Sequence, residues 1–339
     1  MKNKEPLILA VVVFFTLVTY YLVEPFAHSQ MHKHVEGQDF VYNGTADIEE
    51  VEHRIAIAKE GKADTKALEA KLQKKKAFWS DVEKISKLKG DVVAGEGTFA
   101  MCQGCHMEGA ANMGGVTPPS LAHSGALYDT KYLIALIKDP AMASNVDHKY
   151  ADTSMHPMGS IMAMVSEPQD IANVVAFLKA KKSGEVTPKE AFVDSCGRCH
   201  ANRYEQLTQS GFIPKTKADI KTGTDIAMLD FKKKVAQEQI SLAGYLGKLP
   251  PDLSIIIRAR SEHFLETFVE NPQSQLAGTA MPRVGLTKDS YAKVLEYLED
   301  SGDTKRHERE SVGKNVMIYI LIFAIFALLW KREIWRDLH

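Results

Sequence analysis

The chain has 339 residues, which is long enough for about two domains. Hydrophobic residues make up 45% of it, charged residues 25%, and the formal net charge is −1. The near-neutral charge excludes a nucleic-acid-binding protein driven by phosphate attraction, which would carry a basic excess. The hydrophobic fraction excludes a largely disordered chain. The chain has 4 cysteines, and all of them lie in two Cys-x-x-Cys-His strings.

An uncharged, mainly apolar run opens the chain at residues 6–23. As a helix, its length is about 27 Å, close to the hydrocarbon thickness of a bilayer. We therefore expect residues 1–26 to form an N-terminal membrane anchor. A cleaved signal peptide is the alternative, although its apolar core would normally be shorter.

A second apolar run lies at residues 316–330 and is followed by basic residues and Trp335. An apolar surface on every side with a basic and aromatic rim favours a lipid-spanning helix over a buried core helix. We expect this transmembrane helix to cover residues 312–332. Lys2 and Lys4, set against Glu24, predict that the N-terminus is cytoplasmic. Two spans then place both termini on that side and the intervening residues on the other.

Residues 27–90 are rich in charge and show apolar residues at helical spacing, with a break at residues 61–65. We expect a solvated helical hairpin, or stalk, that lifts the next domain off the membrane. A docking arm for a partner subunit is the alternative.

Two similar units follow, at residues 91–183 and 184–304. Each unit has Cys-x-x-Cys-His, then Pro-Pro-x-Leu, then an aromatic-Leu pair, and finally a methionine-containing loop before an amphipathic helix. Such an order of motifs indicates an internal duplication of one small helical domain.

The two Cys-x-x-Cys-His strings predict two covalently bound haem c groups. The two thiols of each string add to the haem vinyl groups, and the adjacent histidine binds the iron. A four-thiolate zinc site or a redox dithiol would not require a histidine after each cysteine pair, and a disulfide between such close neighbours would be strained. The predicted attachment residues are Cys102, Cys105, His106, Cys196, Cys199 and His200.

Methionine is the expected sixth iron ligand, because a thioether raises the reduction potential and closes the iron to substrates. For the second haem, Met281 lies in a loop before the last amphipathic helix. For the first haem we favour Met158, with Met162 as the alternative. His156 or His123 would instead give bis-histidine ligation and a lower potential.

The proline pairs that follow each haem string suggest an orienting role. Pro118 and Pro250 are expected to offer a backbone carbonyl to the outer nitrogen of the haem histidine of their own unit. Their repeated placement favours this role over that of ordinary turn prolines.

The second unit resembles cytochrome c1, the haem subunit of the quinol–cytochrome c reductase (cytochrome bc1) complex. The resemblance covers residues 190–339. It implies that His200 and Met281 are the axial ligands and that Arg260 pairs with a haem propionate. Four stretches carry it: CGRCHANRYEQL (196–207), LPPDLSIIIRAR (249–260), AMPRVGL (280–286) and the tail from HERESVGK to LLWKREIW (307–335).

The chain departs from this family by its N-terminal helix and by an additional haem unit, which looks like one half of a two-haem cytochrome c4 or a generic class I cytochrome c. We therefore expect an all-α protein with two tandem class I cytochrome c-like haem domains between two transmembrane helices.

The resemblance implies electron transfer from a Rieske iron–sulfur protein, next to cytochrome b, to a periplasmic cytochrome c or an oxidase. The expected location is the bacterial inner membrane, with the haem domains in the periplasm and no nucleic-acid partner. We expect the second haem to accept electrons first and the first haem to pass them on. The alternatives are the diheme subunit of a cbb3-type terminal oxidase and a diheme peroxidase with one open iron position.

Overall fold

The computed structural model describes residues 4–27, 36–107, 116–181, 184–217 and 225–336. Lys2, which contributed to the predicted orientation, lies outside these ranges. The described chain is helical except for one short pair of strands, so the all-α expectation is confirmed.

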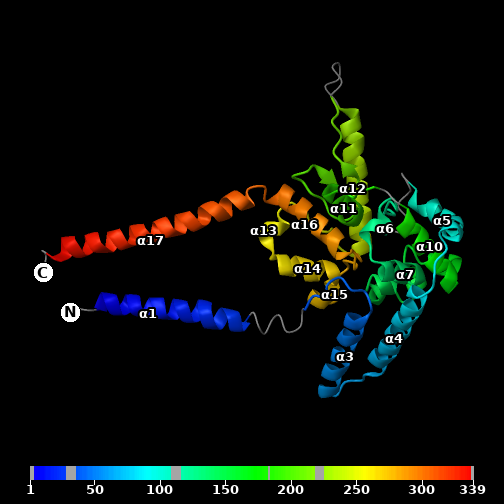
Figure 1. The fold of residues 1–339 in the computed structure, drawn as a ribbon, viewed down its shortest axis with the longest axis horizontal. Helices are drawn as coiled ribbons and strands as arrows, with labels where there is room; N and C mark the ends of the chain where they lie inside the picture. The colour runs from blue at the N-terminus through cyan, green and yellow to red at the C-terminus, as the bar shows by residue number, and fades with distance from the viewer. Residues whose placement is uncertain (1–3, 28–35, 108–115, 182–183, 218–224, 337–339) are drawn as a thin grey trace.

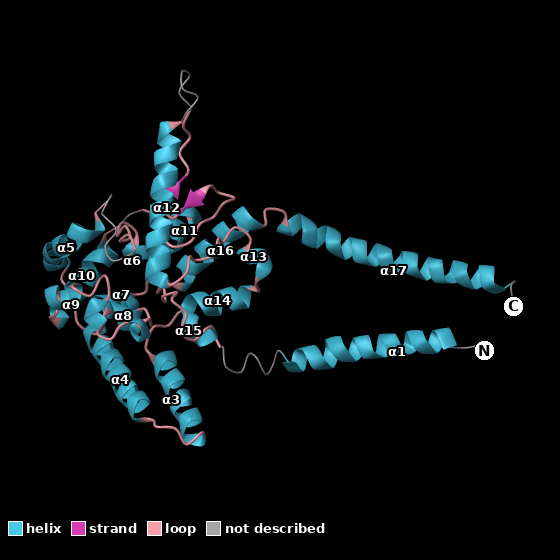
Figure 2. Ribbon diagram, turned by 180° about the vertical axis from the view of Figure 1, so that it is seen from behind, coloured by secondary structure: helices cyan, strands magenta, loops and turns pink. Residues whose placement is uncertain are grey.

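Two apolar helices extend from the same side of a helical body (Figures 1 and 2). The first runs from Lys4 to Ala27 and the second, α17, from Arg306 to Arg336. Both are long and apolar enough to cross a membrane, and neither is buried in the protein. Lys331 near the end of α17 lies 3.2 Å from the Glu5 carboxylate, so the two helices are antiparallel neighbours at their far ends. The first of them consists of α1 (Lys4–Val18), the π-helical η1 (Thr19–Val23) and one further turn.

A helical hairpin of α3 (Thr45–Glu60) and α4 (Lys66–Ser86) precedes the first haem string. The structure differs here from the expected solvated stalk at residues 27–90. The hairpin exposes its charged face, but Phe78, Trp79 and Val82 are buried in the core that it shares with both units. The amphipathic face of α4 packs on the first unit, because burial of those three side chains in apolar surroundings is favourable.

The first unit is built around two crossing helices, α5 and α10. Asp91 caps the start of α5 by accepting a hydrogen bond from the Ala94 amide at 2.9 Å. A Cβ atom on Gly95 would lie 2.0 Å from the Asn173 carbonyl oxygen, so glycine permits the close crossing. The helices of this unit are α5 (Val92–His106), α6 (Ser124–Leu127), α7 (Thr130–Lys138), α8 (Pro140–Ala143), η2 (Asp147–Lys149), η3 (Thr153–Met155), α9 (Ile161–Met164) and α10 (Pro168–Ala180).

The second unit repeats that crossing with α11 and α16. Its remaining elements include a two-stranded antiparallel pair and a long helix, α12, that projects from the body (Figure 1). The elements are α11 (Pro188–Phe192), the π-helical η4 (Val193–Gly197), β1 (Leu207–Thr208), β2 (Gly211–Phe212), α12 (Ile226–Leu246), α13 (Ile256–Ala259), α14 (Glu262–Glu270), α15 (Pro272–Gln275) and α16 (Lys288–Gly302).

An aromatic pair joins the haem-attachment helix to the last helix of each unit. The rings of Phe99 and Phe177 lie 5.0 Å apart in the first unit, and those of Phe192 and Tyr297 lie 4.6 Å apart in the second. Phe99 stands three residues before its first haem cysteine, whereas Phe192 stands four before. The π-helical turn η4, which follows Phe192 directly, accommodates this additional residue.

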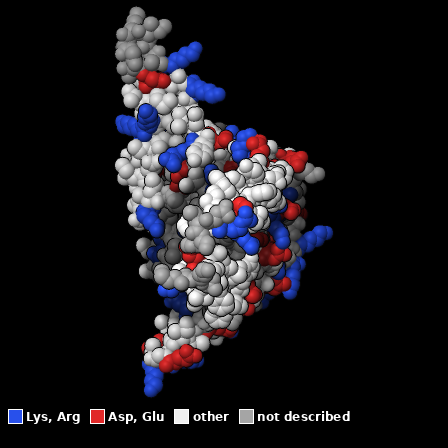
Figure 3. Space-filling view, turned by 90° about the vertical axis from the view of Figure 1, so that its left-hand side faces the viewer, with Lys and Arg blue, Asp and Glu red and all other residues white. Residues whose placement is uncertain are grey.

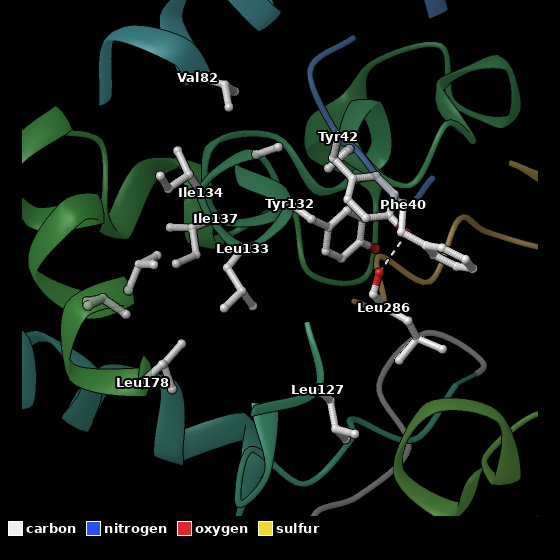
Figure 4. Packing of buried hydrophobic residues seen from close by; sticks show 14 of the residues in the cluster. Phe40, Tyr42, Val82, Leu127, Tyr132, Leu133, Ile134, Ile137, Leu178 and Leu286 are labelled. Carbon is white, nitrogen blue, oxygen red and sulfur yellow. Dashed lines mark hydrogen bonds between the residues drawn. The ribbon is translucent and has the colours of Figure 1, made fainter. Parts of the chain in front are cut away.

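One hydrophobic core runs through the hairpin and both units. Figure 4 shows Val82 of α4 and Ile134 of α7 in the same cluster as Leu286 of the second unit. On the side from which the two apolar helices extend, basic and acidic side chains are interspersed over the body (Figure 3). The two units are therefore parts of a single packed body.

Candidate functional site

The first haem string occupies the last turns of α5, which ends at His106. Cys102 and Cys105 are half-buried free thiols three residues apart, so they lie on the same face of the helix. The His106 Nδ1 atom is 2.8 Å from the Pro119 carbonyl oxygen. Because a carbonyl can only accept, Nδ1 carries the hydrogen and Nε2 keeps a free lone pair for a metal.

The second haem string repeats this geometry. Cys199 and His200 continue the turn after η4, with their amides donating to the Cys196 carbonyl at 3.1 and 2.9 Å. The His200 Nδ1 atom donates to the Pro251 carbonyl oxygen at 2.8 Å. The same atoms thus orient the imidazole in both units.

These two bonds correct the expectation for Pro118 and Pro250. In each unit the accepting carbonyl belongs to the second proline of the pair, Pro119 or Pro251. The pattern pointed to the right dipeptide, but which carbonyl faces the ring depends on the path of the loop. A proline suits the position because it donates no backbone hydrogen bond and its φ angle is restricted.

Burial favours the uncharged form of both histidines and of the thiols of Cys102 and Cys196. It lowers the pKa of His106 and His200, although the hydrogen bond to the proline carbonyl opposes this shift. Burial also raises the pKa of the Cys196 thiol to about 11 and raises that of Cys102. Neutral imidazoles suit iron ligation.

The donor set therefore fits covalent haem better than a bare metal ion. Within the part of the chain that the structure describes, no group of three or more His, Cys, Asp or Glu side chains is arranged to hold a metal ion. Two thiols on one helix face beside an imidazole with a free Nε2 match the thioether and axial bonds of haem c.

The methionine-rich loop of the first unit leaves two candidates for the sixth ligand. Met158 and Met162 are half-buried and pack against the core, whereas Met155 and Met164 are 70% and 49% exposed. The loop thus keeps both of the predicted methionines available and presents the other two to solvent.

The two alternative histidines form different hydrogen bonds. His156 Nδ1 accepts a hydrogen bond from the Met158 amide at 3.0 Å. Its neutral ring therefore carries the hydrogen on Nε2, which has no free lone pair for the iron. His123 Nδ1 lies 2.6 Å from the carboxylate of Asp194, next to the second haem string. The contact of His156 speaks against it as a ligand of the first haem, whereas His123 keeps a free lone pair on Nε2 and stays an alternative.

Met281 lies half-buried in the loop between α15 and α16. The side chain of Gln273 braces the preceding turn: it donates to the Thr279 carbonyl at 2.7 Å and accepts from the Gly278 amide at 2.9 Å. Gly278 has a φ of +80°, a left-handed conformation that glycine adopts without strain. The loop therefore reaches Met281 in a defined conformation.

Arg260 is exposed, and its guanidinium lies 5.1 Å from the centre of the Phe264 ring. It lines a surface pocket of about 410 Å³ together with Arg306 and Arg309 at the start of α17. None of the haem-string residues lines this pocket. The propionate contact of Arg260 stays a prediction of the resemblance.

Helix α12, which the sequence analysis did not single out, connects the second unit to the first. Glu238 of α12 accepts a hydrogen bond from Thr117 at 2.9 Å, in the loop after the first string. Tyr245 of α12 forms a short hydrogen bond with Tyr150. Its spacing of apolar residues was a helical signal, but no haem motif drew attention to it.

Comparisons with known proteins relate parts of the chain to a family, a relative and a solved structure. The family described as Cytochrome c matches residues 92–182. The chain is 25% identical over 208 residues to the ammonia monooxygenase gamma subunit of Nitrosomonas europaea. This alignment covers 48% of this chain and 86% of that protein. A chain of the solved structure "Hyperthermophilic respiratory Complex III" is 26% identical, with a TM-score of 0.32. The alignment covers 45% of this chain and 75% of that chain.

Residues 92–182 are thus a cytochrome c domain, and such a domain implies a covalently bound haem c.

Proposed function

We propose that the protein is a membrane-anchored diheme c-type cytochrome. It carries electrons from the Rieske iron–sulfur protein of a bc1-type quinol–cytochrome c reductase to a periplasmic cytochrome c or an oxidase. The observation that carries the proposal is the repetition, in residues 184–304, of the histidine geometry found in the cytochrome c domain. His106 and His200 each donate from Nδ1 to a proline carbonyl at 2.8 Å.

Haem, when bound, supplies the one-electron chemistry, and the chain supplies position and ligation. His106 and His200 offer Nε2 to the iron while the proline carbonyls fix the ring orientation. Met281 and either Met158 or Met162 would close the sixth position with a thioether, which favours electron transfer over substrate binding. The shared core would hold the two sites at a constant separation.

The proposed partners are the Rieske protein and cytochrome b, and their choice depends on the resemblance of residues 190–339 to cytochrome c1. The related gamma subunit is by its name also part of a larger assembly. We place the haem units in the periplasm of a bacterial inner membrane, with both apolar helices in the lipid.

Purification of the tagged full-length protein from detergent-solubilised membranes tests this proposal. The pyridine haemochrome spectrum should give two haem c per chain, and the Rieske protein and cytochrome b should co-purify. Co-purification of a copper–haem oxidase core would instead identify the cbb3-type subunit. A high-spin haem that binds cyanide in the intact protein would identify a peroxidase-like enzyme.

The order of the two haems is tested with Met158→Ala. If the second haem accepts electrons first, quinol should still reduce it at the wild-type rate while delivery to the soluble acceptor slows. Loss of quinol reduction at both haems would reverse the proposed order.

A further inference from the structure

The loop that carries Met281 belongs to the second unit but lies against the first. The Arg283 amide donates to the Ser144 carbonyl at 2.9 Å, and the Tyr132 hydroxyl donates to the Arg283 carbonyl at 2.8 Å. Gly285 has a φ of +77°, and a Cβ atom there would lie 2.0 Å from the Tyr132 ring. Only glycine fits this approach, so the first unit defines the course of the loop.

The helical hairpin reaches the same loop through a buried carboxylate. Arg283 is 4% exposed and donates from both Nη atoms to the two carboxylate oxygens of Asp47, once at 3.3 Å and once over a shorter distance. Asp47 is 1% exposed and also accepts from Trp79 Nε1 at 3.0 Å. Lys75 Nζ lies 3.6 Å away. The carboxylate thus has a complete set of partners.

The network continues toward the other side of the loop. Lys75 Nζ donates to Asn145 Oδ1 at 2.8 Å, and Asn145 Nδ2 donates to Asn271 Oδ1 at 3.2 Å. Asn271 directly precedes α15, which contains the Gln273 brace. Polar contacts from the hairpin therefore reach the chain on both sides of Met281, at Asn271 before it and at Arg283 after it.

Stability alone is a weak reason for such a cluster. The desolvation penalty of burying Asp47, Lys75 and Arg283 offsets much of the free energy of their mutual attraction. Apolar side chains of similar volume often stabilise a fold equally well. What charges with fixed hydrogen-bond geometry add is a unique position for the backbone that bears them. Here that backbone is two residues from Met281.

We propose that Asp47 is a positioning residue for the axial methionine of the second haem: through Arg283, the α3–α4 hairpin holds loop 280–287 so that Met281 stays on the iron. This inference rests on the proposed role of Met281. The hairpin is then a structural part of the second haem site, although it precedes the first haem string in the chain.

The test compares Asp47→Asn with wild type in the detergent-solubilised full chain. With the loop less restrained, exogenous imidazole should displace Met281 more easily and bind the ferric second haem about 10–100-fold more tightly. The far-red charge-transfer band of methionine-ligated ferric haem should weaken in parallel. The first haem should keep its wild-type imidazole affinity, which general loosening of the fold would not allow.

Asp39→Asn is the matched control. Asp39 lies in the same N-terminal segment and also pairs with a residue of the second unit, Lys288, but both side chains are exposed. This variant should bind imidazole as wild type does. Met281→Ala serves as the reference for complete loss of the ligand and identifies which haem responds.

If Asp47→Asn does not accumulate with its haems, Trp79→Phe replaces it, because this change removes only one of the donors to the carboxylate. It should shift the imidazole affinity in the same direction by less. Wild-type affinity in whichever of the two variants folds would overturn the inference. If Met281→Ala itself leaves the methionine signature of both haems intact, the proposed ligation fails, and this outcome is distinct from failure of the Asp47 link.

Discussion

The two units have the same Cys-x-x-Cys-His string but differ in what surrounds the methionine proposed as its sixth ligand. The first unit has its candidate ligands Met158 and Met162 on residues 156–165, whose hydrogen bonds go to residues 153–165, although Tyr150 just before them bonds to Tyr245 of the second unit. The second unit has its candidate ligand Met281 on a loop held by Tyr132 and Ser144 of the first unit and by Asp47 of the hairpin. A duplicated domain can thus pass part of its structural support to its neighbour, and the two sites then form one folding unit.

Loss of the cysteines has the largest expected effect on this comparison. Cys102→Ala/Cys105→Ala and Cys196→Ala/Cys199→Ala should each reduce the haem content from two to one per chain, because the thioether bonds of one string are removed. In the first variant quinol should still reduce the remaining haem; in the second it should not. Haemochrome spectra and stopped-flow reduction measure both outcomes. Equal loss of reduction in the two variants would contradict the proposed order.

Truncation of the paired aromatic residues comes next. Phe192 is fully buried and stacks on Tyr297, so Phe192→Ala should lower the free energy of unfolding by about 3–5 kcal/mol. Phe99→Ala, the matched change in the first unit, should cost a similar amount. Since both units share one core, each variant should show a single denaturant transition at both haems. Separate transitions for the two haems would show that the units unfold independently.

Acid should weaken the link between the hairpin and the second unit. Burial alone would raise the pKa of Asp47, but Arg283 and Lys75 lower it to about 2, below its unfolded value of 3.8. A lowered carboxyl pKa stabilises the fold above the unfolded value, and this contribution, about 2 kcal/mol, is lost as the pH falls from 4 to 2. Stability curves over this range should therefore be flatter for Asp47→Asn. An identical acid dependence in variant and wild type would rule out this contribution.

The exposed ion pair between Asp39 and Lys288 should contribute least to the free energy of unfolding. Lys288→Gln removes the contact with Asp39, in which both side chains are exposed to solvent. Surface ion pairs contribute little, because water and salt screen them. The denaturation midpoint should match wild type, and a clear decrease would show that this pair supports the interface.

The sequence carried most of the architecture, because its signals were local. Uniform hydropathy marked the terminal helices. The predicted range 312–332 is shorter than α17, because the charged turns that begin at Arg306 continue into the apolar run as one helix. The order of motifs predicted the duplication, and each string led to a histidine whose Nδ1 atom bonds to a proline carbonyl in the structure.

What the sequence could not supply depends on contacts between distant segments. The α4 face with Trp79 and Val82 was visibly apolar, but nothing local says that it packs on the first unit. The choice between Pro118 and Pro119 is a matter of one residue in the path of a loop. The π-helical turn before Cys196 and the ion pair of Asp47 with Arg283, 236 residues apart, appear only when the units are assembled.

With both terminal helices in a membrane, as proposed, their antiparallel arrangement would restrict how the protein moves relative to the bilayer. A body attached by one tether can swivel about it and present any side to a neighbour. Two tethers that leave from the same side, as in Figures 1 and 2, remove this freedom. The body could then not rotate about the membrane normal, so each haem unit would always present the same face to its electron donor or acceptor. The partners would have to move to reach these faces.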